Sequence, residues 1–180
     1  MESYRPSSTG HLIKRVLPAA TLIDHRPERT LERTDLAPAE REIWILHPRG
    51  EPMPTGANPA KVQALLLDGS WVQATGMVRK VLPWGRRVSL PMTGESRYWL
   101  RAQSGPGRFS TIEALLFLLA ALGLDEAHVQ LRLQFELHVF ASLSARGQKQ
   151  QALKYLADSP VRDAFPDLIA KLTHSRRDQE

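Results

Sequence analysis

Short apolar segments alternate with helical patterns along the first two thirds of this 180-residue chain. Residues 43–46 and 64–67 are uniformly apolar, and residues 20–23 and 87–90 are further candidate strands. Strands buried on both faces read as continuous apolar runs, which is typical of parallel sheets with helices on either side. The pattern therefore predicts an α/β fold with a parallel sheet covered on both faces.

The last third of the chain has only helical patterns. Two helices are predicted over residues 125–145 and 148–157, and the first carries apolar side chains three or four apart, namely Val129, Leu133, Leu137, Phe140 and Leu143. We expect these helices to pack as an extension of the core. The expected boundaries are residues 1–125 for the core, 126–172 for the extension of the same domain and 173–180 for a flexible tail.

Composition narrows the classes of partner. The chain has 24 Lys+Arg against 19 Asp+Glu, a net charge of +5, which favours an anionic partner and nucleic acid above all. It has no cysteine, and its six histidines lack metal-ligand spacing, so we expect no metal. The N-terminal segment is polar, and the longest apolar run is shorter than the roughly 20 residues of a membrane span. We therefore expect a cytoplasmic protein without membrane contact.

Asp68-Gly69-Ser70-Trp71 follows the apolar run 64–67 and precedes a predicted helix over residues 70–80. In open α/β sheets, ligands bind outside the carboxyl ends of the strands. An aspartate before a helix is often only a cap or turn residue. At the end of a buried strand, however, Asp68 is expected to be partly desolvated, which would favour a role as a general base.

Three predicted helices begin with small hydroxylic residues. They start at Thr9-Gly10, at Ser70-Trp71 and at Ser110-Thr111, and the pairs Ser70/Gln73 and Ser110/Glu113 have capping-box spacing. Capping is the simplest role for both serines. A helix N-terminus also presents unpaired N–H groups and a partial positive charge, so converging ends would form a pocket for a small anionic or zwitterionic ligand.

Basic residues gather between the second and third of these helix starts. With the aromatic residues Trp84, Tyr98 and Trp99 between them, they suit contact with phosphates and unstacked bases as well as a simple solvated surface. The members are Arg79, Lys80, Arg86, Arg87, Arg97, Arg101 and Arg108.

Together these segments resemble the DTW-domain family of tRNA-uridine aminocarboxypropyltransferases. Leu67-Asp68-Gly69-Ser70-Trp71 is similar to the family's Asp-x-Thr/Ser-Trp signature, with serine in place of the usual threonine. The resemblance extends in order over residues 5–125, through the segments Ser8-Thr9-Gly10-His11-Leu12-Ile13, Arg79-Lys80, Arg97-Tyr98-Trp99-Leu100-Arg101 and Phe109-Ser110-Thr111-Ile112-Glu113-Ala114.

The resemblance implies a fold related to the SPOUT class, with a knotted α/β core that binds S-adenosylmethionine. It also implies transfer of the 3-amino-3-carboxypropyl group to N3 of a uridine in tRNA. Family members commonly carry an N-terminal cysteine-rich segment, which this sequence does not show. A SPOUT-type RNA methyltransferase and a non-catalytic RNA-binding module are the alternatives.

Residue roles follow from the resemblance by position. Asp68 is the expected base that removes the uridine N3 proton. The expected cofactor-binding residues are Thr9, Gly10, Leu46, His47, Ser70, Trp71, Ala74, Leu90, Ser110, Thr111 and Glu113. The expected tRNA contacts are Arg79, Lys80, Arg97, Arg101 and Arg108.

Overall fold

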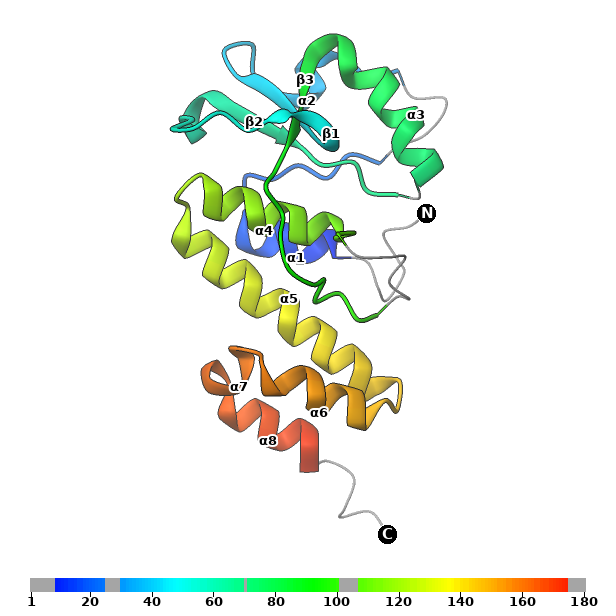
Figure 1. The fold of residues 1–180 in the computed structure, drawn as a ribbon, viewed down its shortest axis with the longest axis vertical. Coiled ribbons are helices and arrows are strands. Elements are labelled where there is room, and N and C mark those ends of the chain that lie inside the picture. The colour runs from blue at the N-terminus through cyan, green and yellow to red at the C-terminus, as the bar shows by residue number, and fades with distance from the viewer. Residues whose placement is uncertain (1–8, 25–29, 70, 101–106, 175–180) are drawn as a thin grey trace.

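The computed structural model describes residues 9–24, 30–69, 71–100 and 107–174 (Figure 1). The elements in chain order are α1 (Gly10–Val16), α2 (Arg33–Leu36), β1 (Glu42–Pro52), the 3₁₀ helix η1 (Pro59–Lys61), β2 (Val62–Leu65), α3 (Trp71–Val81), the 3₁₀ helix η2 (Leu82–Trp84), β3 (Gly85–Ser89), α4 (Thr111–Ala121), α5 (Asp125–Ala145), α6 (Lys149–Ala157), α7 (Val161–Ala164) and α8 (Pro166–His174).

The three strands form one parallel sheet in the order β2-β1-β3. Alternate residues of β1 lie on opposite faces of the sheet. Ile43 and Ile45 pack with Val78 and Val81 of α3, whereas Trp44 joins the large core that includes residues of α4 and α5. Figure 1 shows α3 on one side of the sheet and α4 with α1 on the other. The predicted parallel sheet with two covered faces is confirmed.

Strand β1 does not end at His47, where its polar residues begin. Its pairing with β3 shifts, so that Leu46 and Glu51 both pair with Val88 and residues 47–50 form a bulge. A Cβ at Gly50 would lie 2.6 Å from the backbone of Arg87 and Val88, so the strand can close after the bulge only with glycine there. The predicted strand over residues 20–23 is wrong, because that segment has no regular structure.

The C-terminal part of the chain is helical, as predicted, and α5 contacts α4 and α6 (Figure 1). Helix α5 buries Leu131, Phe135, Val139, Phe140 and Leu143. Of the apolar face predicted from the sequence, Phe140 and Leu143 are buried, whereas Val129 is 54 % exposed and does not join the core. The predicted tail lies outside the described residues, apart from the end of α8.

Candidate active site at the carboxyl edge of the sheet

Asp68 meets the N-terminus of α4 at the carboxyl edge of the sheet. It follows β2, and its Oδ1 accepts a hydrogen bond of 2.9 Å from the hydroxyl of Thr111, the first residue of α4. The two residues are 43 positions apart in the chain, so the fold joins two separate sequence motifs. Among the described residues, Thr111 is the only hydrogen-bond donor to Asp68, so the other acceptor sites of its carboxylate have no donor from this part of the chain.

The Asp68 side chain is exposed. The expectation that it would be partly desolvated is therefore wrong. The apolar run before it ends at half-buried residues, and β2 is an edge strand of the sheet, so the chain has already reached the surface at residue 68. An exposed carboxylate with a single protein donor can approach a ligand without losing an internal contact.

The bulge after Leu46 belongs to the same edge, because the carboxyl ends of parallel strands lie together. In it, Nδ1 of His47 accepts a hydrogen bond of 3.1 Å from the backbone N–H of Arg49. Burial, together with the charges of Arg87 and Arg49, lowers the pKa of His47. The imidazole is therefore neutral at pH 7 and carries its proton on Nε2, which can donate to a ligand.

The Glu113 side chain is surrounded by hydrogen-bond donors of the protein. Its buried carboxylate accepts hydrogen bonds from the Ser96 hydroxyl (2.9 Å), the Arg97 backbone N–H (2.6 Å), and the backbone N–H and hydroxyl of Ser110 (both 2.7 Å). The predicted capping box with Ser110 is confirmed. Because four donors use its acceptor capacity, Glu113 ties the loop over residues 96–97 to the start of α4.

Arg97 is turned toward the helical extension. Its guanidinium donates to Glu136 (3.0 Å) and to the backbone carbonyl of Tyr155 (2.9 Å), and it lies 4.1 Å from the centre of the Tyr155 ring. Burial and Glu136 together raise the pKa of Tyr155, so its hydroxyl stays protonated. Since these partners hold the guanidinium, we leave Arg97 out of the RNA interface expected from the sequence.

Sequence reasoning did not identify Glu136. This residue is 1 % exposed and binds both Arg97 and, four residues earlier on α5, Arg132. The available signal was a glutamate on the apolar face of a long helix with an arginine four residues before it. A buried carboxylate there requires cationic partners.

The other expected cofactor-binding residues lie around the strand and helix ends. Thr9 is buried before α1, Gly10 begins α1, Trp71 begins α3, and Ala74 is half-buried in α3. Leu46 and Leu90 are half-buried where β1 bulges and β3 ends. Ser70 lies outside the described residues.

Among the expected RNA contacts, Arg79 and Lys80 are exposed in the last turn of α3, and Arg108 is exposed before α4. Arg101 lies outside the described residues. Arg86 is used by the fold, because it pairs with Glu42 and Glu51 and lies over the ring of Trp44.

In the part of the chain that the structure describes, no group of three His, Cys, Asp or Glu residues could hold a metal ion. No helix within the same ranges is long and apolar enough to cross a membrane.

Comparison with known proteins identifies the family. The model of the DTW domain matches residues 1–145, which include Asp68, Thr111 and all of α5. The chain belongs to the DTW-domain family. Neither a curated protein nor a solved structure matches it. Membership in the DTW-domain family is consistent with a tRNA-modifying transferase and implies interaction with tRNA.

Proposed function

We propose that this DTW-domain protein transfers the 3-amino-3-carboxypropyl group of S-adenosylmethionine to N3 of a uridine in tRNA. The observation that carries the proposal is the hydrogen bond between Asp68 and Thr111, since it brings two motifs of the family together at the ligand-binding edge of a parallel sheet. We also propose that the chain forms the knotted SPOUT-type core, whose sheet is parallel as this one is.

The residues at this edge fit the cofactor by their chemistry. The bulge after Leu46 and the segment at Leu90 supply backbone groups, and the N–H groups at the start of α4 suit the carboxylate of an amino acid. Asp68 is exposed and accepts one hydrogen bond from the described residues, so its carboxylate suits the neighbourhood of a sulfonium cation. The proposed cofactor-binding set is Thr9, Gly10, Leu46, His47, Ser70, Trp71, Ala74, Leu90, Ser110 and Thr111, while Glu113 acts by holding the start of α4.

Asp68 accepts the N3 proton of the uridine in this mechanism. When bound, S-adenosylmethionine would supply an electrophilic carbon next to a sulfonium, so that the N3–carbon bond would form as the carbon–sulfur bond breaks and its electron pair passes to sulfur. Thr111 holds one oxygen of Asp68, leaving the other for the proton. A uridine over Asp68 excludes water and supplies the desolvation that the exposed side chain lacks. The main contribution of the protein is positioning.

The tRNA contact is proposed for the exposed residues Arg79, Lys80 and Arg108, together with Arg101. Arg79 and Lys80 are on the helix that follows the Asp68 segment, and Arg108 is two residues before Ser110. Arg108 would bind a phosphate next to the target uridine, whereas Arg79 and Lys80, about 12 Å along α3 from its start, would bind the tRNA backbone farther from it.

Mass spectrometry of nucleosides tests this function. The protein is incubated with unmodified tRNA and S-adenosylmethionine, and the tRNA is then digested. We expect a uridine heavier by one aminocarboxypropyl group. A methylated uridine would instead show the methyltransferase alternative, and the absence of product together with no calorimetric binding of S-adenosylmethionine would show an RNA-binding module.

A further inference from the structure

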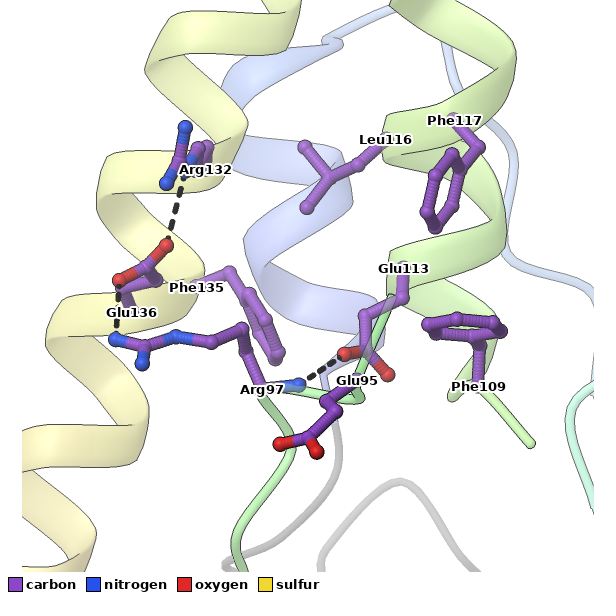
Figure 2. Close-up of a pocket in the computed structure, with 9 residues that line it drawn as sticks. All are labelled: Glu95, Arg97, Phe109, Glu113, Leu116, Phe117, Arg132, Phe135 and Glu136. Carbon is purple, nitrogen blue, oxygen red and sulfur yellow. Dashed lines mark hydrogen bonds and ion pairs between the residues drawn. The ribbon is translucent and has the colours of Figure 1, made fainter. Parts of the chain in front are cut away.

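A pocket opens between α4, α5 and the loop before α4 (Figure 2). Its volume is about 160 Å³, and three phenyl rings from different segments line it: Phe109 before α4, Phe117 in α4 and Phe135 in α5. The rings of Phe109 and Phe117 meet edge to face, with centroids 5.2 Å apart. The walls therefore suit a flat, aromatic ligand.

Most of the charged groups around these rings are paired with other groups of the protein. Arg97 and Arg132 both bind Glu136, and the carboxylate of Glu113 is occupied by its four donors. Glu95 is different: it lines the pocket, is exposed, and has no hydrogen-bond partner in the described ranges of the chain. In Figure 2 its carboxylate lies at the edge of the pocket, away from that of Glu113.

The balance of charge favours a ligand that donates hydrogen bonds. Three carboxylates and two guanidiniums line the pocket, so its formal charge is negative; its exposed ionic groups are the Glu95 carboxylate, an acceptor, and Arg132, whose Nε is held by Glu136. A carboxylate recognises a base by accepting from an amino group, as with N4 of cytosine. A phosphate would instead meet Glu95 with unfavourable charge.

The pocket adjoins the candidate active site through the first turn of α4. Thr111, which bonds Asp68, and Glu113, which lines the pocket, are two residues apart and therefore point about 200° apart around the helix. A ligand in the pocket and a ligand on Asp68 would lie on opposite sides of one helix end. That separation suits neighbouring nucleotides of an RNA strand whose bases are unstacked.

We propose that this pocket binds an unstacked RNA base bearing an exocyclic amino group, stacked on the phenyl rings and held by Glu95. Its role next to the target uridine rests on the proposed function. Binding of the base itself does not, since it requires neither S-adenosylmethionine nor Asp68. Cytosine is the best-matched probe. At C4 it carries an amino group where uracil has a carbonyl, and its N3 has no proton, whereas N3 of uracil is protonated.

The test is an NMR titration of backbone amides with cytidine monophosphate and, separately, uridine monophosphate, without S-adenosylmethionine or tRNA. We expect shifts centred on residues 95, 117 and 135, and cytidine monophosphate to bind about tenfold more tightly. Glu95→Gln should remove that preference, whereas Glu40→Gln, a change at an exposed glutamate outside the pocket, should keep it. Phe117→Leu should weaken both nucleotides.

Equal binding of the two nucleotides, a preference that survives Glu95→Gln, or shifts outside the pocket would overturn the proposal. Competitive displacement by S-adenosylmethionine would also overturn it, by assigning the pocket to the cofactor. The Asp68→Asn variant separates this proposal from the proposed function. It should bind cytidine monophosphate as the unchanged protein does, and a fully active variant would count against the mechanism alone.

Discussion

Two carboxylates lie at the same end of α4 and differ in how the protein uses them. Glu113 is 5 % exposed and accepts four hydrogen bonds, whereas Asp68 is exposed and accepts one from the described residues. A buried carboxylate with satisfied acceptor sites stabilises the fold, because losing it strands its donors. An exposed carboxylate with one partner retains sites for a substrate. The difference gives Glu113 a structural role and agrees with the chemical role that we propose for Asp68.

The largest loss of stability is expected for Glu113→Gln. The amide replaces one carboxylate oxygen with an NH2 group, which meets the backbone N–H of either Arg97 or Ser110, so the free energy of unfolding should fall by about 3 kcal/mol. Urea denaturation measures it. The exposed Glu126→Gln should change the value by less than about 0.5 kcal/mol. Equal effects of the two substitutions would remove the distinction between the two carboxylates.

A smaller loss is expected for Arg97→Met, which leaves Glu136 buried with Arg132 as its cationic partner. Because the Arg97 side chain is 26 % exposed, solvent screens part of the charge, and we expect a loss of about 2 kcal/mol. Urea denaturation measures the loss, and Arg162→Met, a change at an exposed position on α7, is the control. If the Arg97→Met variant were as stable as the unchanged protein but bound tRNA more weakly, Arg97 would belong to the RNA interface.

Substitutions of the exposed basic residues in the last turn of α3 are expected to lower the affinity for tRNA and leave stability unchanged. Arg79→Gln and Lys80→Gln should each lower the salt dependence of tRNA binding by about 0.7 to 1 in the log–log slope, because each removes one phosphate contact. Fluorescence anisotropy over a salt series measures it. Lys154→Gln, on the exposed face of α6, is the control, and a loss of slope as large in that variant would mean non-specific binding.

The smallest effect is expected at His138, which packs edge to face on His11. Burial, followed by the charges of His11 and Arg146, lowers its pKa from the ordinary 6.5. The unfolded chain then takes up a proton before the folded chain does, so stability should be full above pH 6.5 and fall below it. His47, whose pKa is also lowered, acts in the same direction.

Thermal melting between pH 7.5 and 5.5 checks this expectation. His138→Gln should flatten the dependence on pH, and His128→Gln, on the same helix, serves as the matched change. A steeper fall in the His138→Gln variant would contradict the sign.

The fold could be predicted where the pattern of residues is local. The apolar runs predicted the parallel sheet, and the spacing of Ser110 and Glu113 predicted the capping box. The extension of β1 through residues 47–52 could not be predicted in the same way. It depends on a bulge and on a close approach of Gly50 to β3, and both are tertiary contacts of polar residues.

The candidate site could be predicted in its members but not in their roles. The sequence placed Asp68 and Thr111 in two motifs, and only the fold shows that they touch. Glu113 and Arg97 were expected to bind ligands, yet their side chains are held by Ser96, Ser110 and Glu136. Residue type and spacing do not reveal whether a charged group is already paired.

Asp68→Asn, measured for transfer and for cofactor binding in the same preparation, tests the central claim most directly. We expect the melting temperature and the calorimetric affinity for S-adenosylmethionine to stay close to those of the unchanged protein. The rate of formation of modified uridine should fall by at least about 100-fold, as for loss of a general base. A fully active Asp68→Asn variant, or one that unfolds as readily as Glu113→Gln, would contradict the division of roles between the two carboxylates.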